Sequence, residues 1–525
     1  MAHAITPADL RHLFESGGSF ALLDVREAGE YNSSHIPGSS LLSRRQIEFQ
    51  THHLVPYMDA AVVVCDDDGR RAHLASETLE RMGYLNVSVL AGGINRWVTE
   101  GHPTEWGTNV PSKDFGERVE VEYHVPEIDA VDLEERVRRG DKIVILDTRT
   151  PEEYRRFCIP GGRSVPGGEL ALRISDILEG SGEGTTVVVN CAGRTRSIIG
   201  TRTLQRMGIS DLYGLKNGTS GWVLAGYQLE TGGDRLDLPG PSAEGLGAAE
   251  AYADRVAEED QVGRLSVAEV RDLMNRRTRE PVYLIDVRTE GEYAEGHIPG
   301  FHWFPGGQAV QRSDDVVAIR GATIVFACEK KVRSSITASW YRQMGFEKVY
   351  VVAGGIEAWQ AAGLSLEKGM PDAGSFGGAE ARSKVRIVSP HEVDQGPESA
   401  RIFVGTSREF AYGHVPSSRW VPRGWLELQV EEAAPSKETP VLVTCVDGSQ
   451  SLLAGGTLAD LGYADVAVLE GGTTRWRDSG MPMERGLSGV MAPPADMVPM
   501  GPDRNYADMM NYLRWEEALG EKYAR

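Results

Sequence analysis

Four cysteines in this chain each end a short apolar run and are followed by a short polar loop. The runs read VVVC, VVVNC, IVFAC and VLVTC, and they end at Cys65, Cys191, Cys328 and Cys445. A stretch of helical character follows each loop, such as RSIIGTRTLQRMG from Arg196. Backbone N–H groups at a helix N-terminus stabilise a thiolate and bind an anion beside it. The pattern therefore predicts nucleophilic cysteines in anion-binding loops.

The four loops differ in charge. In the six residues after the cysteine, the first and fourth loops (DDDGRR and VDGSQS) carry a net −1, whereas the second and third (AGRTRS and EKKVRS) carry +2. A loop arginine adds a bidentate fork for an oxyanion, so the positive loops suit a thiolate and an anionic substrate. We predict that Cys191 and Cys328 are catalytic, and Cys191 is the stronger candidate. The predicted substrate-binding residues are Gly193, Arg194, Arg196, Ser197, Lys330, Lys331 and Arg333.

The other two loops predict inactive copies. The acidic run DDD after Cys65 should raise the pKa of that thiol, repel an anionic donor and could itself fill the anion-binding loop. We take Arg70 as the loop arginine of this copy, with four residues between it and the cysteine. The fourth copy has Gln450 in place of the arginine. Structural support is the expected role of both copies.

Each cysteine belongs to a longer repeat. A strand-like run precedes it and ends at an aspartate in three copies; the positions are Asp24, Asp147, Asp286 and Gly405. The turns HIPG, CIPG, HIPG and HVPS come next, and a glycine-rich turn with a tryptophan closes each copy at Trp97, Trp222, Trp359 and Trp476. The spacing from the aspartate position to cysteine is 41, 44, 42 and 40 residues, and from cysteine to tryptophan 32, 31, 31 and 31. We infer four copies of one unit, with the four cysteines at one equivalent position.

The combination of LDVR, HIPG, C-x4-R and GG-x-x-x-W resembles the rhodanese domain, and four copies cover nearly the whole chain. The loop CAGRTRS at Cys191 is similar to the active loop of that family. The resemblance implies a sulfurtransferase without a cofactor. Its loop cysteine would take sulfane sulfur from a small anionic donor such as thiosulfate, hold it as a persulfide and pass it to cyanide or a thiol. It also implies that a catalytic domain is paired with an inactive one.

The elements that position these loops follow from the sequence pattern. Continuous apolar runs alternate with helix-period stretches, which is typical of an open, mostly parallel sheet flanked by helices. Asp147 and Asp286 should lie at strand ends and support the loops, through hydrogen bonds to the loop backbone or to the following arginine. We predict four tandem rhodanese-like α/β domains at residues 1–105, 122–232, 260–368 and 383–485, followed by a C-terminal tail at 486–525.

The connecting segments suggest how the domains are grouped. The longest gap, between the second and third copies, contains GDRLDLPGPSAEGLGAAEAYADRVAEED. We interpret it as a loose linker between two domain pairs, so that the first copy supports the second. In the tail, an amphipathic helix is predicted; its apolar residues are Tyr506, Met509, Met510, Leu513 and Trp515. Packing of this helix on the body is preferred over a homodimer contact.

Composition limits the function further. The chain has 525 residues and a net charge of −21, so it should repel nucleic acid. Five cysteines are few and odd in number, which favours a reducing compartment. The sequence contains no Cys-x-x-Cys pair of the kind that binds zinc, so no metal site is predicted. With no signal peptide and no apolar run of membrane-spanning length, we predict a cytoplasmic protein that binds no membrane.

Two other functions remain open at this stage. One is a non-catalytic scaffold of rhodanese-like binding modules, which the two degenerate loops favour for the first and fourth copies. The other is a cysteine phosphatase or arsenate reductase of the same fold. Those enzymes carry a longer C-x5-R loop, whereas Cys191 and Arg196 are separated by four residues.

Overall fold

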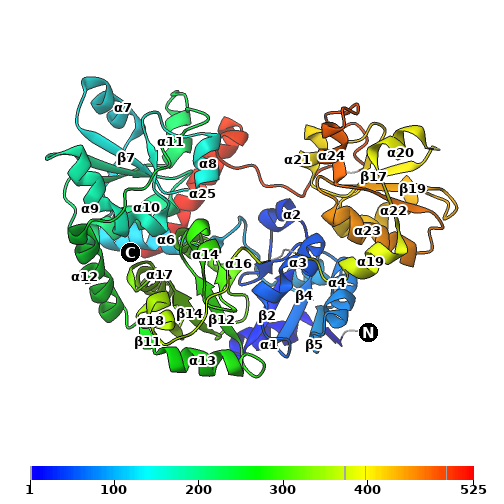
Figure 1. Ribbon diagram of the computed structural model, residues 1–525, viewed down its shortest axis with the longest axis horizontal. Helices are drawn as coiled ribbons and strands as arrows, with labels where there is room; N and C mark the ends of the chain where they lie inside the picture. Colours follow the sequence, from blue (N-terminus) through cyan, green and yellow to red (C-terminus); the bar gives the residue numbers. More distant parts are fainter. Residues whose placement is uncertain (1–2, 372–373, 397, 492, 525) are drawn as a thin grey trace. The chain divides into compact units, whose positions relative to one another are not determined.

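The computed structural model describes all residues except 1–2, 372–373, 397, 492 and 525. It contains four five-stranded parallel sheets with the same strand topology, which are β1-β5-β4-β2-β3, β6-β10-β9-β7-β8, β11-β15-β14-β12-β13 and β16-β20-β19-β17-β18. Helices flank each sheet (Figure 1). The predicted fold class of four tandem α/β domains is therefore confirmed, and we call these domains R1 to R4 in chain order.

R1 and R4 have the following elements. The strands of R1 are β1 His3–Ile5, β2 Phe20–Asp24, β3 Ser40–Leu41, β4 Ala61–Cys65 and β5 Asn86–Leu90. Its helices are α1 Pro7–Glu15, α2 Ala28–Ser33, η1 Arg44–Gln46, α3 Ile47–Leu54, α4 Arg70–Arg81 and α5 Gly93–Thr99. The strands of R4 are β16 Arg386–Val388, β17 Ala400–Phe403, β18 Arg419–Trp420, β19 Val441–Thr444 and β20 Val466–Leu469. Its helices, preceded by α19 Gly378–Lys384, are α20 Pro390–Gln395, α21 Ser407–Tyr412, η3 Arg423–Trp425, α22 Leu426–Ala433, α23 Ser449–Asp460 and α24 Gly472–Asp478.

R2 and R3 repeat this plan. The strands of R2 are β6 Glu127–Ile128, β7 Ile143–Asp147, β8 Arg163–Ser164, β9 Thr186–Asn190 and β10 Leu212–Leu215. Its helices, preceded by α6 Val110–Tyr123, are α7 Ala130–Arg139, α8 Pro151–Arg156, η2 Gly167–Glu169, α9 Leu170–Ser181, α10 Thr195–Met207 and α11 Gly218–Leu224. The strands of R3 are β11 Gly263–Leu265, β12 Val282–Asp286, β13 His302–Trp303, β14 Thr323–Ala327 and β15 Val349–Val352. Its helices, preceded by α12 Ala243–Glu259, are α13 Val267–Arg276, α14 Glu290–Glu295, α15 Gly306–Gln311, α16 Ser313–Val316, α17 Val332–Gln343 and α18 Gly355–Ala361.

Local sequence explains where these elements start and stop. The central strands are buried on both faces, as their unbroken apolar runs predict. The predicted helix caps Thr6, Ser266 and Ser389 each accept a hydrogen bond from the backbone three residues on, and the residue there closes a capping box. None of the described helices is long and apolar enough to span a bilayer.

The domains do not pair in the order that the linkers suggested. One compact unit comprises residues 1–108 and 372–498, which hold R1 and R4, and the other comprises 109–371 and 499–525, which hold R2 and R3. We call them the outer unit and the inner unit. The predicted loose linker between R2 and R3 is instead helix α12, which buries Ala249, Tyr252, Ala253 and Val256 against α9 and α17. Its alanine-rich composition indicated a packed helix rather than a flexible chain.

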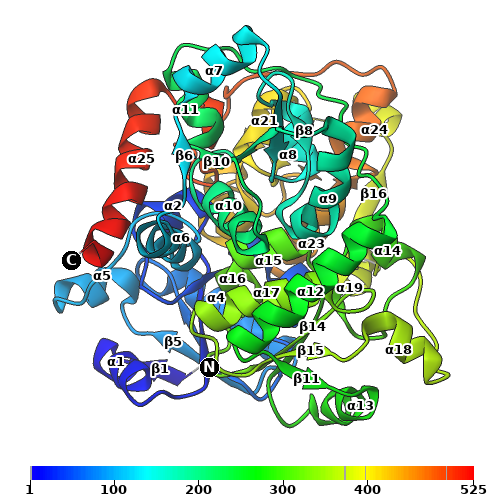
Figure 2. The same ribbon diagram turned by 90° about the vertical axis from the view of Figure 1, so that its left-hand side faces the viewer.

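The tail divides between the two units. Residues 486–498 belong to the outer unit, and residues 499–525 belong to the inner unit. Helix α25 (Tyr506–Gly520) packs along α6, with Met509 and Leu513 buried, whereas Tyr506 and Met510 are exposed (Figures 1 and 2). The expectation that the tail helix packs on the body is therefore confirmed.

Strand register places Asp66, rather than Cys65, at the loop position of R1. Asp147 of β7 pairs with Asn190, one residue before Cys191, but Asp24 of β2 pairs with Cys65 itself. The backbone agrees, because Thr219 N–H donates to the Cys191 carbonyl and the corresponding Ile94 N–H donates to the Asp66 carbonyl. The prediction of four equivalent cysteines is wrong for this copy. Cys65 ends a buried strand.

The same register corrects two further residues. From Asp66 the sixth loop position is Arg71, and Arg71 rather than Arg70 pairs with Glu30 of α2. In R4 the strand pairs Phe403 with Thr444, one residue before its cysteine, so Phe403 replaces the strand aspartate, not Gly405.

Candidate active site

Cys191 lies where β9 ends and the loop to α10 begins. The sulfur is directed toward the Ser197 hydroxyl at 3.5 Å, and only 2% of the residue is exposed. Thr219 and Ser220 at the start of α11 donate backbone hydrogen bonds to the carbonyls of Cys191 and Ala192 at 2.8 and 3.1 Å. These bonds fix the first two residues of the loop, so that the thiol sits below the N-terminus of α10.

Arg196 is held by an acidic partner outside the loop. Its two terminal nitrogens donate to the Glu153 carboxylate at 2.7 and 2.8 Å. Glu153 is also the third residue of α8, where its carboxylate accepts from the Thr150 N–H. Burial acts to raise the pKa of Glu153, but the charge and hydrogen bonds of Arg196 outweigh it and lower this pKa to about 2. The guanidinium is therefore oriented by a permanently charged carboxylate.

Arg194 points away from Arg196 and has a second acidic partner. Its Nε and Nη2 donate to Glu117 of α6 at 2.7 and 2.9 Å, and Glu127 lies 3.5 Å from Nη1. Burial raises the pKa of Glu117 to about 7, against the opposing effect of Arg194. Arg194 thus ties the loop to α6, which lies outside the R2 sheet. The net +2 of the loop is matched by these carboxylates, so counting loop charges alone overstated the local positive charge.

Gly193 is where the tail helix meets the loop. A Cβ placed on Gly193 would lie 3.1 Å from Oε2 of Glu516 and 3.5 Å from Cε1 of Tyr512, both on α25. Glycine here leaves room for the close approach of these side chains, and its backbone is not left-handed. Side chains of α25 therefore lie against the loop.

The strand aspartates of R2 and R3 contact the arginines two residues later. Asp147 accepts three hydrogen bonds from the Arg149 side chain, at 2.7 to 3.2 Å, and Arg149 also donates to the Phe157 carbonyl at 2.6 Å. Asp286 and Arg288 repeat the arrangement in R3. Each pair is buried and joins the end of a central strand to the turn before the next one.

R3 keeps the loop geometry but surrounds its arginine with acid. Cys328 lies 3.2 Å from the Ser334 hydroxyl and accepts from the Ser334 N–H at 3.4 Å. Arg333 contacts three carboxylates, which are Glu292 and Glu329 of R3 and Glu169 of R2. Burial raises the pKa of Cys328, and Arg333 opposes this effect.

The two lysines of the R3 loop are directed elsewhere. Lys331 donates to Asp254 of α12 at 2.7 Å, and Lys330 lies 3.5 Å from Glu357 of α18. Both ion pairs are largely exposed, and neither brings the ammonium group to the sulfur of Cys328. The two lysines of the loop are therefore paired with carboxylates of α12 and α18.

In R1 a carboxylate occupies the anion-binding loop. Asp66 is 1% exposed and accepts backbone hydrogen bonds from Gly69 at 2.5 Å and Arg71 at 2.8 Å. Arg71 pairs with Glu30 and Asp67 and lies 3.8 Å from the ring centre of Trp425 in R4. Burial, followed by the Asp24 charge, raises the pKa of Cys65 well above its usual value.

R4 keeps its cysteine but has no loop arginine, and the Asp447 carboxylate lies 3.5 Å from the sulfur of Cys445. Cys445 accepts hydrogen bonds from the N–H groups of Gly448 and Ser451 at 3.1 and 3.4 Å. Gln450 stands at the arginine position and receives only a long bond of 3.5 Å from Arg423. Burial raises the pKa of the Cys445 thiol.

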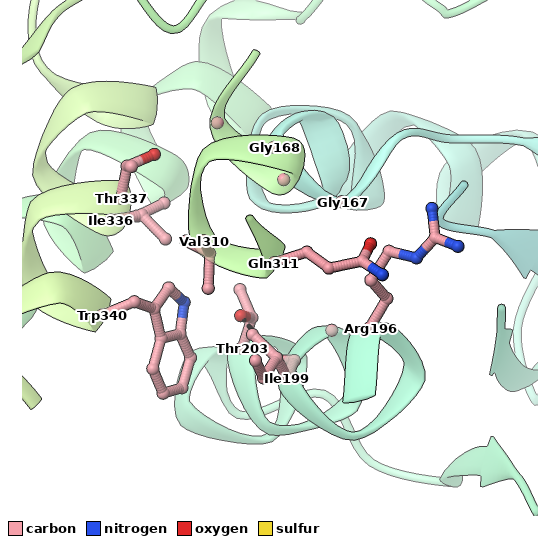
Figure 3. Close-up of a pocket in the computed structure, with 13 residues that line it drawn as sticks. Gly167, Gly168, Arg196, Ile199, Thr203, Val310, Gln311, Ile336, Thr337 and Trp340 are labelled. Atoms are coloured by element: carbon pink, nitrogen blue, oxygen red, sulfur yellow. Dashed lines mark hydrogen bonds between the residues drawn. The ribbon is translucent and has the colours of Figure 1, made fainter. Parts of the chain in front are cut away.

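A small pocket of about 40 Å³ lies between R2 and R3 within the inner unit. Glycines from η2 and α15 line one side, and Arg196 and Gln311 lie next to each other at one end (Figure 3). Ile199, Val310 and Trp340 make much of the remaining wall apolar. The pocket reaches the loop arginine of R2 from the neighbouring domain.

Sequence reasoning missed the acidic partners and the tail residues. Glu30, Glu153 and Glu292 share a signal, because each lies six residues after the strand aspartate and at the third position of a helix. Glu117, Tyr512 and Glu516 have no repeat signal, since they come from helices outside the repeats. Among the described residues, no group of three or more His, Cys, Asp or Glu side chains could hold a metal ion.

Comparisons with known proteins agree with this geometry. The rhodanese-like domain model matches residues 6–100, 129–225, 266–362 and 398–479. The crystal structure of a thiosulfate sulfurtransferase from Pseudomonas aeruginosa superposes with a TM-score of 0.88 at 34% identity, covering 99% of this chain and 98% of that one.

Shorter relatives match single domains. The thiosulfate sulfurtransferase GlpE of Pseudoalteromonas translucida is 29% identical over 102 residues, which are 19% of this chain and 89% of that protein. The probable adenylyltransferase/sulfurtransferase MoeZ of Mycobacterium tuberculosis is 32% identical over 100 residues, 19% of this chain, and the chain spans only 25% of its length. Four family matches along one chain, on four sheets of one topology, show that this protein belongs to the rhodanese-like family.

Proposed function

We propose that the protein is a thiosulfate sulfurtransferase that carries sulfur as a persulfide on Cys191. The observation that carries the proposal is the R2 loop, where a cysteine at a helix N-terminus has an oriented arginine and a serine hydroxyl beside it. The relatives named thiosulfate sulfurtransferase support the same chemistry. A small anionic donor fits a loop of backbone N–H groups.

The reaction has two half-reactions at one sulfur. The Cys191 thiolate attacks the outer sulfur of thiosulfate, the S–S bond of the donor breaks and sulfite leaves. An acceptor such as cyanide or a thiol then takes the outer sulfur and restores the thiolate. Arg196 and the N–H groups of the loop stabilise the negative charge that develops on sulfite.

The other site residues have distinct roles in this proposal. Gly193 and Ser197 shape the loop, and Arg194 anchors it to α6. Asp147 and Asp286 support the loops of R2 and R3 through their arginines. Cys328 serves as a second, weaker site; Arg333 would bind its donor, and Lys330 and Lys331 would contribute only long-range charge.

Mapping the persulfide tests the proposal. After incubation with thiosulfate and removal of the donor, mass spectrometry of the intact protein and its peptides should show one added sulfur on Cys191. Cys191→Ser should reduce thiosulfate:cyanide turnover to background or to a residue supplied by Cys328, and Cys445→Ser serves as the matched control. Full turnover in Cys191→Ser, with loss in Cys328→Ser, would assign the chemistry to R3.

A non-catalytic role is proposed for the outer unit only. Asp66 replaces the nucleophile of R1, and Phe403, Gly405 and Gln450 replace the Asp–Arg pair and loop arginine of R4. These two domains act as a scaffold in the proposal. Phosphatase or arsenate chemistry is disfavoured, because the two loops with both cysteine and arginine have four intervening residues.

A further inference from the structure

Glu516 of α25 is a buried carboxylate with one unused oxygen beside the Cys191 loop. The residue is 1% exposed, and its Oε1 accepts a hydrogen bond from the Tyr512 hydroxyl at 2.7 Å. Its Oε2 is buried and has no hydrogen-bond partner among the described residues. This is the oxygen that would lie 3.1 Å from a Cβ on Gly193. An acceptor-only group is therefore directed at the loop, and a buried unpaired carboxylate oxygen is costly unless something uses it.

The charged groups around Glu516 come from α6, from the Cys191 loop and from the tail. Lys113 of α6 is buried and lies 5.1 Å from the ring centre of Tyr512. Burial raises the pKa of Glu516, while Lys113, the Tyr512 hydrogen bond, Arg194 and Arg504 act in the opposite direction. Glu117 is the neighbouring carboxylate, and Glu516 is one of the charges that raise the pKa of Glu117. The result is a carboxylate more basic than an exposed one and kept from water.

The same cluster is electrostatically linked to the reactive sulfur. The pKa of Tyr512 is raised by burial, by Glu516 and also by the negative charge of Cys191. Because Glu516 and Tyr512 both lie against Gly193, two residues after Cys191, the cluster borders the loop that would hold the persulfide. A fixed carboxylate gives no help to a thiosulfate dianion, because like charges repel. It can help an acceptor that must lose a proton.

We propose that Glu516 accepts the proton of a thiol acceptor, so that the natural acceptor of the Cys191 persulfide is a thiol. The inference rests on the proposed function. A free thiol has a pKa of about 8.5, so only a few per cent is thiolate at neutral pH, and the thiolate is the nucleophile. A carboxylate within reach of the loop generates the thiolate at the point of attack.

The step balances without an added oxidant or reductant. The acceptor thiol R–SH gives its proton to Oε2 of Glu516, and its sulfur attacks the outer sulfur of the Cys191 persulfide, which carries the second proton. The new S–S bond joins the acceptor to the outer sulfur, and the bond from that sulfur to Sγ of Cys191 breaks. The products are R–S–SH, the Cys191 thiolate and protonated Glu516, which returns its proton to solvent.

The experiment compares two acceptors on one loaded protein. Wild type and Glu516→Gln are loaded with thiosulfate, freed of donor, and mixed in single turnover with 2-mercaptoethanol or with sulfite, whose sulfur carries no proton to remove. At pH 7, the ratio of the thiol rate constant to the sulfite rate constant should fall roughly 10- to 100-fold in Glu516→Gln. Glu516→Asp should recover part of the ratio. Glu521→Gln, which removes an exposed carboxylate from the same tail, should leave it unchanged.

The pH profile gives a second readout that a merely structural role would not change. In Glu516→Gln the thiol rate should rise about tenfold per pH unit below the thiol pKa, because only preformed thiolate reacts. In wild type it should rise less steeply. If Glu516→Gln takes up sulfur normally and its ratio of thiol to sulfite rate constants is unchanged, Glu516 does not accept the proton. The proposed function is unaffected by that result. Failure of wild type to take up sulfur from thiosulfate would overturn the proposed function instead.

Discussion

The outer and inner units are two versions of the same domain pair, and they differ in what fills the loop. In R1 the carboxylate of Asp66 occupies the backbone N–H groups that would bind an anion. In R2 the corresponding residue is Cys191, and the neighbouring contacts come from Ser197 and Arg196. The same loop backbone therefore holds a carboxylate in R1 and a thiol in R2, and in both domains the loop arginine is paired with a glutamate.

The contact between the paired domains differs as well. In the outer unit large and charged side chains make the contact, since Arg44 pairs with Glu427, Arg423 with Glu48, and Trp425 lies against Arg71. In the inner unit, the glycine pairs 167–168 and 306–307 meet instead, and a pocket remains next to Arg196. The outer unit also keeps a pocket of about 200 Å³, lined by Glu27 and Glu30 of R1 and by Trp420 and Trp425 of R4. The two contacts therefore differ in their chemistry, since ion pairs and aromatic rings form one and glycine backbone forms the other.

Alkylation should separate the two units most strongly. Iodoacetamide at neutral pH should label Cys191 faster than Cys65, because Cys65 lies within the paired part of a central strand and burial with the Asp24 charge raises the pKa of its thiol. The measurement is peptide mass spectrometry over time. Replacing Asp67 and Asp68 by Asn tests the cause. Fast labelling of Cys65 in that variant would show that charge, rather than its place in the strand, protects it.

Arg196 and Arg71 occupy equivalent positions and should have opposite phenotypes. Arg196→Ala should lower kcat/KM for thiosulfate by roughly 10- to 150-fold, equal to about 1.5–3 kcal/mol for a charge-assisted bond, and Arg196→Lys should restore only part. Arg71→Ala should leave turnover unchanged. It should destabilise the outer unit by about 3–5 kcal/mol, because the largely buried carboxylate of Glu30 loses its positively charged partner. Steady-state kinetics and urea unfolding distinguish them. Equal kinetic losses in both would break the comparison.

Acid should weaken the inner unit through the carboxylates that hold its loop arginines. Glu153 and Glu292 both have a pKa lowered to about 2 in the folded protein, so the stability they add is fully present above their unfolded pKa of 4.5 and is lost as pH falls toward 2. Each contributes roughly 3 kcal/mol by linkage. The difference in urea unfolding free energy between wild type and Glu153→Gln should shrink steadily below about pH 4.5 and be nearly gone at about pH 2. A constant difference down to pH 2 would contradict this account.

The glycine contact predicts a smaller difference in packing tolerance. A Cβ on Gly168 would meet the Gly307 backbone nitrogen at 3.0 Å, whereas on Gly424 it would meet the Glu27 side chain at 2.8 Å. Backbone cannot move aside as a side chain can, so Gly168→Ala should cost about 1–3 kcal/mol and Gly424→Ala less. Thermal unfolding of the two single variants measures this. A larger loss in Gly424→Ala would show that the R1–R4 contact is the less adaptable one.

Much of the fold was predictable, because the repeat carries its own evidence. Unbroken apolar runs predicted buried parallel strands, and Thr6, Ser266 and Ser389 predicted helix starts. The spacing also indicates the shift in R1, because Cys65 to Trp97 is 32 residues, whereas the other three copies have 31. Measured from Asp66 the spacing is 31. The extra residue marked a shifted cysteine.

The pairing of domains and the partners of the loop could not be predicted in the same way. Which domain packs on which depends on surfaces such as Trp425 over Arg71, and a single sequence gives no distance between them. Glu117 and Glu516 reach the R2 loop from helices that no repeat includes. Local patterns predicted the loop itself, and long-range packing decided what surrounds it.

In the sequence, residues of the inner unit lie between the two segments of the outer unit, and this sets an order for synthesis on the ribosome. R1 emerges first, but its partner segment begins at residue 372, about 260 residues after R1 ends. At a synthesis rate of roughly 5–20 residues per second, about 13 to 50 seconds pass between the end of R1 and the start of the segment that holds R4. Helix α25 is translated after all four domains, so Cys191 is made long before the segment that covers it. Until then the newly made thiol of R2 has no cover from Tyr512 and Glu516, and a nascent chain should react with a persulfide donor or an alkylating agent more readily than the finished protein.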